Sequence, residues 1–438
     1  MMKPLPTVAT APRLGWRDAV ATLRSEPTHA RVLGGSIIML VGSGLVSAIN
    51  FGYNVAVARM LGPAAFGHAA AAVTLLMLVS AITLSFQLVC AKFVARNETD
   101  GGKAEVYSSL LRRAFIVGST LGVALLLASN YVAGYLHLPS RWVVTLLALG
   151  IAFYIPLGVK RGGLQGTCAF GRLSWNFLLE AATKFAGAVV LVELGYGVYG
   201  AVAAISISVV LAYFFPSVPA ELRITPVPRN RASFHEGMQA IVFFTGQVVI
   251  NNIDILLVKH FFPSDQAGLY AAIALVGRVI YFASWSVVSA MFPISAGAKP
   301  KEEHSSVLVV PLVIVLIISL VFIVGLAMFP DVVLRTVFGT GFHIGTSMNT
   351  LMSLYAAATG AYSLAVVLMA YEMSRKIANT GWMQLAISGA IMIGITLFHA
   401  DLRQVVVVQL VLMVVLLMIV SIPFFRTHRN SVIREAAA

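Results

Sequence analysis

The sequence predicts an all-α polytopic membrane protein, and two features of the chain carry that prediction. First, 59% of the residues are hydrophobic and 11% are charged, and the mean hydropathy is +0.90. Second, the apolar residues are gathered into twelve segments. Most of them approach the ~20 residues that cross a ~30 Å hydrocarbon core as a helix. Inside lipid a helix satisfies its own backbone hydrogen bonds, so helices are the expected structure.

The predicted spans follow one another with short links, so consecutive helices should be antiparallel neighbours. The first six are 33–58, 66–91, 109–134, 142–159, 173–194 and 197–216. The next six are 238–262, 267–293, 307–329, 346–370, 381–399 and 404–425. The polar, proline-containing stretch 217–237 is the expected cytoplasmic linker between two six-helix bundles. Residues 1–32 and 426–438 are the expected cytoplasmic tails.

Basic residues identify the cytoplasmic side. Most of the 30 Lys and Arg residues fall in the two tails and the even-numbered links. The opposite side has Arg59, Arg141, Lys259, Arg335 and Arg403. Because basic loops stay in the cytoplasm, both termini are predicted to be cytoplasmic. The net charge of +13 is spread over every cytoplasmic loop, where it meets anionic lipid headgroups. Membrane lipids are therefore expected partners, and nucleic acid is not.

The two halves of the chain look duplicated. Three residues recur after 200 positions: Asn54, Arg59 and Pro63 are followed by Asp254, Lys259 and Pro263. One extra residue in the second turn then shifts the offset, so that Gly67, Ala70 and Ala71 match Gly268, Ala271 and Ala272. Each piece is a helix that ends in a basic residue and a Pro/Gly turn before it re-enters the membrane. Two parallel halves with a site between them form a transporter plan.

No enzyme motif accompanies the spans. The sequence contains no zinc-ligand spacing, no nucleotide-binding Gly-rich loop and no Ser/His/Asp cluster. Its cysteines, Cys90 and Cys168, form neither a disulfide framework nor a metal site. The longest outer link, about 330–345, is short for a domain that would hold a glycan acceptor. We therefore expect no enzyme, no cofactor and no metal, and a membrane-embedded glycan polymerase or ligase is the remaining enzymatic alternative.

Ionisable residues deep within a span typically face a bundle interior or a wet cavity, and four stand out here. Glu180 and Lys184 are one turn apart on one helix face and can pair. Asp254 lies about 12 Å and Arg278 about 16 Å from the outer helix ends, depths that are compatible with a second pair. Two interpretations stay open. These residues form a cationic cavity that binds an anionic headgroup, with Asp254 or Glu180 as ion-coupling groups, or they form internal salt bridges.

Uncharged polar side chains within the spans are candidates for the same cavity. The substrate-binding candidates of this kind are Asn54, Gln87, Gln247 and Asn251. The alternative for each is a hydrogen bond to a neighbouring helix. Arg59 and Lys259 end their helices, and we expect them to snorkel toward the membrane interface.

Three stretches resemble one known family. They are ARMLGPAAFGHAAAAVTLL with KFVAR (58–76 and 92–96), KRGGLQGTCAFGRLSWNFLLEAATKFAGAVVLVELGYGVYGAVAA (160–204), and NNIDILLVKHFFPSDQAGLYAAIALVGRVIYF (251–282). They are similar to the oligosaccharide (O-antigen and exopolysaccharide) flippases of the MATE-like multidrug/oligosaccharidyl-lipid/polysaccharide exporter superfamily. The stretches cover roughly a quarter of the chain, and the helix count and the duplication extend the likeness to nearly all of it.

The resemblance implies two six-helix bundles in a V, with alternating access between them. It implies a bacterial inner-membrane protein that moves an undecaprenyl-diphosphate-linked oligosaccharide from the inner to the outer leaflet. Family members place basic residues in the central cavity, and Lys184 and Arg278 match by position. A polysaccharide polymerase or glycosyltransferases are candidate partners. The alternative is an ion-coupled drug or metabolite exporter of the same superfamily, which a cavity dominated by carboxylates would favour.

Overall fold

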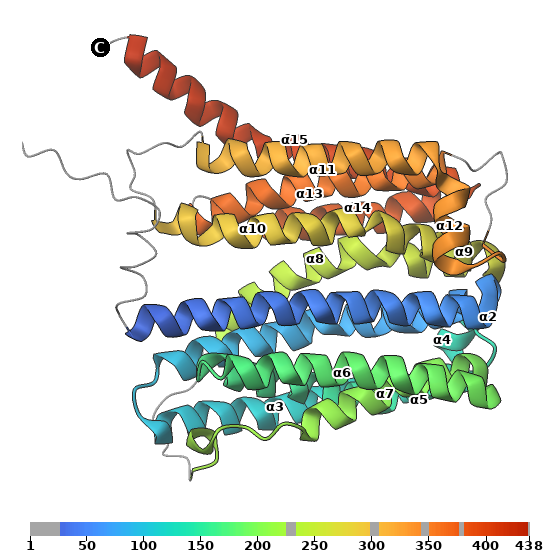
Figure 1. Cartoon of the computed structure of the whole chain (residues 1–438), viewed down its shortest axis with the longest axis horizontal. Helices are drawn as coiled ribbons and strands as arrows, with labels where there is room; N and C mark the ends of the chain where they lie inside the picture. The colour runs from blue at the N-terminus through green and yellow to red at the C-terminus, as the bar shows by residue number, and fades with distance from the viewer. Residues whose placement is uncertain (1–26, 225–233, 298–305, 343–349, 376–380, 437–438) are drawn as a thin grey trace, which may run out of the picture.

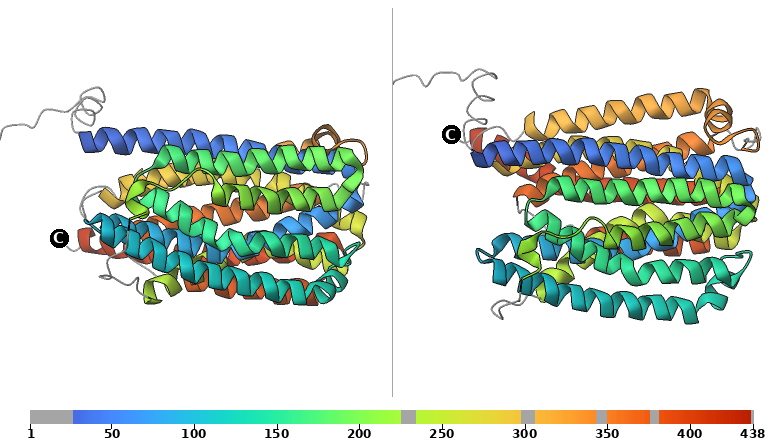
Figure 2. Two further views of the ribbon diagram at one scale, coloured as in Figure 1. Left: turned by 90° about the horizontal axis from the view of Figure 1, so that it is seen from below. Right: turned by 60° about the horizontal axis from the view of Figure 1, so that its bottom comes forward.

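The structure, a computed structural model, describes residues 27–224, 234–297, 306–342, 350–375 and 381–436. These residues are almost entirely helical and contain no strand. The long helices lie side by side along one common axis, and this arrangement holds in every view (Figures 1 and 2). The fold class is therefore the predicted one, an all-α polytopic membrane protein.

The helices pack as two halves (Figure 1). The N-terminal half contains α2 (Pro27–Arg96), α3 (Asp100–Leu127), α4 (Ser129–Tyr135), α5 (Arg141–Gly166), α6 (Phe170–Leu191) and α7 (Gly197–Phe214). The C-terminal half contains α8 (Phe234–Phe261), α9 (Ser264–Gly277), α10 (Val279–Gly297), α11 (Ser306–Met328), α12 (Pro330–Phe338), α13 (Leu351–Arg375), α14 (Gly381–Leu397) and α15 (Leu402–Ala436). The halves meet where α2 packs against α8 and α9.

Two glycines divide long helical stretches into separate crossings. Within α2 the backbone breaks at Gly62, whose φ is 75°. Between α6 and α7 it breaks at Gly195, whose φ is 89°. A positive φ is accessible to glycine without steric cost, so each turn can be tight. Both breaks fall in links that the sequence predicts.

Length and hydropathy agree with membrane insertion. Among the described residues, 8 stretches are long and apolar enough to cross a membrane. Two of them, Val41–Arg96 and Phe170–Phe214, contain the glycine breaks and are long enough to cross twice. On α11 the exposed side chains include Val310, Ile317 and Val321, as expected for a lipid-facing helix. The total of twelve crossings and the cytoplasmic side of the termini stay predictions.

The predicted inner end of the fourth helix is wrong. The sequence places the end of the fourth span at residue 159, whereas α5 continues to Gly166. Lys160 and Arg161 are therefore not loop residues, and both are buried. The Lys160 ammonium donates to the backbone carbonyls of Ala212 (3.0 Å) and Tyr213 (2.6 Å) near the end of α7. These neutral acceptors at a helix C-terminus satisfy the charge inside the protein.

Part of the predicted linker folds onto the N-terminal half. Residues Ala220–Leu222 form a short 3-10 helix, and Leu222 is buried in the cluster that contains Tyr107. The Lys103 ammonium lies 3.2 Å from the Glu221 carboxylate. The predicted linker 217–237 therefore begins as a docked segment, and residues 225–233 lie outside the described part of the chain.

The halves touch most closely at a pair of glycines that the repeat matches, Gly67 and Gly268. A Cβ on Gly67 would lie 2.7 Å from the carbonyl oxygen of Ser264. A Cβ on Gly268 would collide with the carbonyl oxygen of Pro63. Pro63 and Ser264 each lie four residues before the glycine of their own half, so each half presents the same contact to the other. A reciprocal contact of this kind is the signature of a two-fold relation.

Two basic residues join the halves near this glycine contact. Arg59 donates from Nε to the carbonyl oxygen of Val337 (2.8 Å) and also hydrogen-bonds that of Thr336, in the last turn of α12. Lys259 donates to the carbonyl oxygen of His137 (3.4 Å), just after α4. Arg59 and Lys259 are 200 positions apart, as are His137 and Val337, so the two contacts are repeats of each other. We call these two contacts the latch.

The latch corrects one expectation about Lys259. Its side chain does not snorkel to the interface, because it is 0% exposed and also hydrogen-bonds the Ser264 hydroxyl at 2.9 Å. Arg59 remains exposed, yet it holds the opposite half rather than only facing headgroups. A basic side chain at the C-terminal end of a helix interacts favourably with the free carbonyls and the helix dipole. The latch lies at the end of the bundle that the charge distribution predicts to be outer.

Candidate functional site

The N-terminal half contains a polar cluster built around Lys184 on α6. Its ammonium donates a hydrogen bond to Oδ1 of Asn50 on α2 and lies 5.1 Å from the ring centre of Tyr53. Lys184 and Asn50 are both partly exposed. Among the described residues, no carboxylate lies within ion-pair distance of Lys184. The cation is therefore held by neutral groups.

Glu180 pairs with a residue that the sequence did not suggest. Its carboxylate forms a salt bridge with the guanidinium of Arg161 on α5. Arg161 also donates from Nε to Oδ1 of Asn176 (2.8 Å), and its guanidinium lies 4.0 Å from the ring centre of Phe177. The predicted Glu180–Lys184 pair is therefore wrong. The prediction treated Arg161 as a loop residue, and a planar guanidinium from the adjacent helix takes the carboxylate instead.

Asn176 extends this cluster to the third helix. It is 0% exposed, and its amide nitrogen donates to the carbonyl oxygens of Ala212 (2.6 Å) and Phe215 (2.8 Å) at the end of α7. Arg161, Asn176 and Glu180 thereby connect α5, α6 and α7 through one hydrogen-bonded network. Each buried polar group in this network has a partner, which a stable interior requires.

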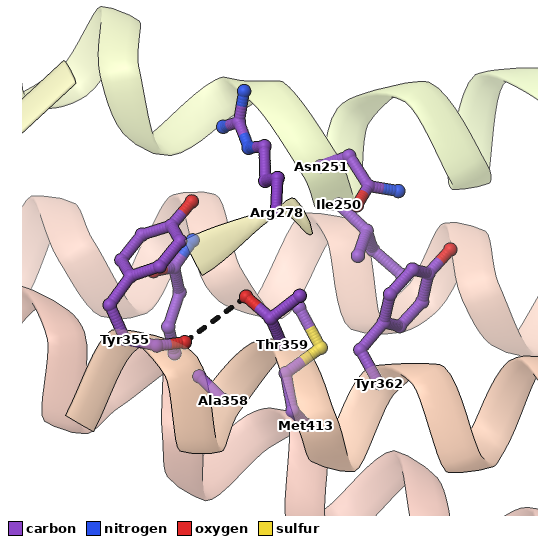
Figure 3. A pocket seen from close by; sticks show the side chains of 9 residues that line it. Ile250, Asn251, Arg278, Tyr355, Ala358, Thr359, Tyr362 and Met413 are labelled. Carbon is purple, nitrogen blue, oxygen red and sulfur yellow. Dashed lines mark hydrogen bonds between the residues drawn. The ribbon is translucent and has the colours of Figure 1, made fainter. Parts of the chain in front are cut away.

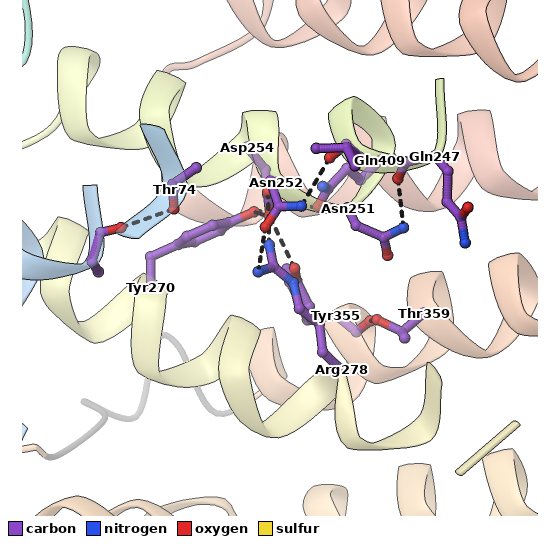
Figure 4. A network of polar contacts seen from close by, with 12 residues as sticks. Thr74, Gln247, Asn251, Asn252, Asp254, Tyr270, Arg278, Tyr355, Thr359 and Gln409 are labelled. Atoms are coloured by element: carbon purple, nitrogen blue, oxygen red, sulfur yellow. Dashed lines mark hydrogen bonds and ion pairs between the residues drawn. The ribbon is translucent and has the colours of Figure 1, made fainter. Parts of the chain in front are cut away.

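The C-terminal half confirms the other predicted pair. Nη2 of Arg278, which follows α9, lies 3.1 Å from Oδ1 of Asp254 on α8 (Figure 4). The second carboxylate oxygen, Oδ2, accepts hydrogen bonds from the hydroxyls of Tyr270 (3.0 Å) and Tyr355 (2.9 Å). Asp254 is 0% exposed, and Arg278 also contacts Oδ1 of Asn252 at 3.4 Å. The carboxylate is thus enclosed by one cation and two hydroxyl donors.

A small cavity adjoins this ion pair. It has a volume of about 20 Å³, and Figure 3 shows the side chains around it. The lining residues are Ile250, Asn251, Arg278, Tyr355, Ala358, Thr359, Tyr362, Gln409 and Met413. Nε of Arg278 is buried there without a hydrogen-bond partner. A space of this size accommodates one water molecule and excludes a sugar or a diphosphate.

The remaining predicted site residues make local contacts. Asn54 donates to the carbonyl oxygen of Asn50 (2.8 Å), which places it next to the Lys184 cluster. Asn251 donates to the carbonyl oxygen of Gln247 (2.8 Å), and Gln247 donates to the hydroxyl of Tyr281 (2.6 Å).

Gln87, on α2, hydrogen-bonds α5 one turn beyond Arg161. It donates to Oε1 of Gln165 near the end of α5, at 3.3 Å. The structure therefore divides the predicted site residues between the two halves. It does not bring all of them together in one site.

The two halves differ in electrostatic balance. In the N-terminal half, Lys160, Arg161 and Lys184 accompany the single carboxylate of Glu180. In the C-terminal half, Arg278 and Asp254 neutralise each other. The excess positive charge, and with it the capacity to hold phosphate oxygens, therefore lies in the N-terminal half. Within the described residues no group of three His, Cys, Asp or Glu could hold a metal ion.

Sequence comparison identifies one family. The family described as "Polysaccharide biosynthesis protein" matches residues 56–344, which is more than half of the chain. No curated protein sequence matches the chain significantly.

Comparison with solved structures shows the fold. An inward-facing multidrug resistance MATE family transporter of the MOP superfamily aligns with a TM-score of 0.72 at 14% identity, over 90% of this chain and 96% of that chain. The lipid II flippase MurJ in an inward closed conformation aligns with a TM-score of 0.69 at 12% identity, over 89% and 87% of the two chains. An outward-facing MATE transporter aligns less closely, with a TM-score of 0.59 at 16% identity over 94% and 97%. At these identities the likeness establishes the shared fold alone.

Proposed function

The chain belongs to the polysaccharide biosynthesis protein family, and we propose that it is a flippase for a lipid-linked oligosaccharide. In this proposal it moves an undecaprenyl-diphosphate-linked glycan from the inner to the outer leaflet of a bacterial inner membrane. It acts as a carrier and catalyses no covalent step. The polyprenyl tail stays in lipid, while the diphosphate and the sugars pass through a polar path between the halves.

The observation that carries the proposal is the environment of Lys184. Lys184 is a partly exposed residue whose ammonium bonds a neutral amide oxygen, whereas Arg161 and Arg278 are each paired with a carboxylate. A diphosphate oxygen can replace the Asn50 oxygen at Lys184 without breaking an ion pair. Charge-assisted hydrogen bonds are about twice as strong as neutral ones, so this exchange favours the anion. Lys184 is therefore the proposed anchor for the diphosphate, with Asn50 and Asn54 beside it.

The other charged residues have positioning roles in this proposal. Arg161 and Glu180 connect α5 to α6, and Asp254 and Arg278 connect α8 to the end of α9. Because both carboxylates are paired with arginine, neither Glu180 nor Asp254 is free to exchange a coupling ion. Gln247 and Asn251 support the helices around the small cavity, and Gln87 supports the inner end of α5.

The latch supports the proposal of alternating access. We propose that the bodies formed by 33–216 and 238–425 rock about the contact between α2, α8 and α9, opening a V toward one side at a time. The closed latch at the predicted outer end supports an inward-facing or occluded state. The higher TM-score against the inward-facing MATE transporter than against the outward-facing one is consistent with it. A membrane potential that is negative inside then favours outward movement of an anion by ~2.3 kcal/mol per charge per 100 mV.

The substrate also defines the partners in this proposal. Glycosyltransferases supply the lipid-linked glycan on the cytoplasmic face, and a polymerase or ligase consumes it on the outer face. Docking of these enzymes on the cytoplasmic loops is a further part of the hypothesis. Membrane lipids contact the exposed apolar side chains of the spans.

Reconstitution tests the proposed function. Purified protein is placed in liposomes with a fluorescent polyprenyl-diphosphate oligosaccharide, and an impermeant glycosidase reports the fraction in the outer leaflet. We expect protein-dependent exchange of the glycolipid and no gradient-driven efflux of cationic dyes. Efflux of dyes under a proton or sodium gradient without glycolipid exchange would replace this proposal by the drug or metabolite exporter.

A further inference from the structure

A buried carboxyl group at the inner end of α13 has no countercharge among the described residues. Glu372 lies near the end of α13, on the side predicted to be cytoplasmic, and it is 1% exposed. Its Oε1 is buried and has no hydrogen-bond partner. No salt bridge among the described residues includes it. Asp254 and Glu180, in contrast, are both paired with arginine.

A second buried oxygen near Glu372 also has no partner. Oε1 of Gln384 on α14 is buried without a hydrogen bond, and the residue is 2% exposed. Nε2 of Gln384 lies 3.2 Å from the sulfur of Met369. Met369 precedes Glu372 by three residues on α13, so the two share a helix face. Gln384 thus lies beside the turn of α13 that precedes Glu372, and each of the two residues has a buried oxygen that a proton donor would satisfy.

Few charged groups face this position. The helices α9, α10, α11 and α15 pack against α13. Neither α10, α11 nor α14 contains a charged residue. Tyr355, which bonds Asp254, precedes Glu372 by 17 residues, or about 25 Å along the helix. The Asp254–Arg278 pair is therefore remote from Glu372.

The titratable groups closest to this end begin on α13 itself. Arg375 follows Glu372 by three residues, and its side chain lies outside the described part of the chain, as does Lys376. Tyr362 and Tyr371 lie on α13 itself, and Tyr281 on α10 stacks on Tyr362. Asp265 and Tyr270 lie on α9 and Arg403 at the start of α15, toward the other end of the bundle. The inner ends of α8 and α15 also carry His235, Glu236 and Arg426, whose side chains lie outside the described part of the chain.

The physical consequence concerns the charge state of Glu372. Burying an ionised carboxylate without a countercharge costs several kcal/mol, and such a group takes up a proton instead. A protonated carboxyl is one hydrogen-bond donor with acceptor capacity left over. It can therefore satisfy a nearby oxygen such as that of Gln384, which an ionised carboxylate cannot do.

We propose that Glu372 is a proton-binding site whose occupancy is linked to the transport conformations. One proton from the aqueous phase adds to a carboxylate oxygen and gives a neutral acid at the buried position of Glu372. Its release returns the proton to water and leaves a carboxylate that must be hydrated, so the inner end of α13 must become accessible to water. The linkage to the latch rests on the proposed alternating access, whereas the protonation of Glu372 does not.

Infrared spectroscopy of the purified full-length protein tests the protonation. The wild type at neutral pH is expected to show the C=O stretch of a buried carboxylic acid, with a shift in heavy water. Glu372→Gln should lose this band, and Glu193→Gln, which changes an exposed glutamate, should retain it. A wild-type spectrum without the band, or a band that survives in Glu372→Gln, would overturn the proposal. If Glu372→Gln does not fold, Glu372→Asp should shift the band and keep it.

Distances between two spin labels, measured by double electron–electron resonance in proteoliposomes, then test whether protonation of Glu372 is linked to the latch. Spin labels at exposed Tyr131 on α4 and Val332 on α12 report whether the latch is closed. Binding of one proton changes the ratio of closed to open latch by up to about tenfold per pH unit. Rising pH should favour the closed latch, because the ionised Glu372 opens the inner end to water and only one end opens at a time. Glu372→Gln should lose this response.

The histidines near the latch do not affect the comparison of wild type with Glu372→Gln. His137 and His260 stack near the latch and are present in both proteins, so the difference between wild type and Glu372→Gln isolates Glu372. Equal pH responses in the two proteins would overturn the linkage. Because the infrared band needs no substrate, a failure of glycolipid exchange would be distinguishable from a failure of this proposal.

Discussion

Arg59 donates a hydrogen bond to the carbonyl oxygen of Val337 across the two halves, at 2.8 Å. The same relation, displaced by 200 positions, joins Lys259 to His137. Each contact places a basic side chain at the carbonyl end of a short helix in the opposite half, α12 or α4. A duplicated chain thereby closes one end of its bundle with two copies of one interaction. Opening that end requires both copies to break.

Removing one copy of the latch should favour the open outer end. Arg59→Gln loses a charge at the end of α12, an interaction worth about 0.3–1 kcal/mol. We expect the ratio of open to closed forms to rise by about two- to fivefold, since 1.4 kcal/mol is tenfold. The spin-label pair on α4 and α12 measures this ratio. Arg335→Gln, whose partner Asp331 lies on the same helix, is the matched control. A ratio unchanged in Arg59→Gln would show that the latch does not hold the halves together.

The glycine contact should be sensitive to a single methyl group. In Gly67→Ala or Gly268→Ala the added Cβ meets backbone atoms of the other half, which cannot move aside as a side chain can. We expect the latch distance to increase in both variants. Gly44→Ala, where nothing lies within 4 Å of the new atom, should leave it unchanged. Wild-type distances in Gly67→Ala and Gly268→Ala would mean that the two halves do not approach as closely as described.

The Asp254–Arg278 pair should contribute to stability rather than to substrate binding. Removal of one partner of a buried pair costs about 3–5 kcal/mol, because it leaves an uncompensated charge. We expect Asp254→Asn to lower the melting temperature of the detergent-solubilised protein markedly. The double variant Asp254→Leu with Arg278→Met should recover much of the loss. A stable Asp254→Asn protein with impaired glycolipid exchange would instead place Arg278 in the substrate path.

Substitutions in the Arg161–Glu180 pair and at Lys184 should differ in their effect on thermal stability. Glu180→Gln leaves the buried Arg161 without its carboxylate, and loss of a charge-assisted hydrogen bond costs about 1.5–3 kcal/mol. We expect lower thermal stability in Glu180→Gln and near-normal stability in Lys184→Gln, which removes a cation bound to a neutral group. Thermal unfolding of both variants checks this difference. Equal destabilisation by the two substitutions would show that Lys184 has a structural role.

The sequence predicts the fold and one of the two ion pairs for identifiable reasons. Long apolar segments and their links are visible as composition, and Gly62 falls in a predicted turn. The depths of Asp254 and Arg278 could be compared because a short turn joins their helices, so the pair was predictable. Arg161 was missed because a charged residue at the end of an apolar run resembles a loop residue.

Contacts that depend on tertiary packing left no signal in the sequence. Tyr270 and Tyr355 both bond Asp254, but tyrosines within apolar helices have no spacing that identifies a partner. The repeat matches Gly67 to Gly268 without indicating that the two residues touch. Lys259 resembles an interfacial anchor, and only the approach of α4 from the other half encloses it.

The central claim is that Lys184 holds the diphosphate of a lipid-linked glycan. The most direct measurement is glycolipid exchange between leaflets in proteoliposomes that contain wild type, Lys184→Gln, Lys184→Arg or Arg403→Gln. We predict that Lys184→Gln lowers the exchange rate about tenfold or more, as loss of one charge-assisted contact implies. Lys184→Arg should retain much of the rate, and the exposed Arg403→Gln control should match the wild type. Wild-type exchange by a folded Lys184→Gln protein would contradict the account.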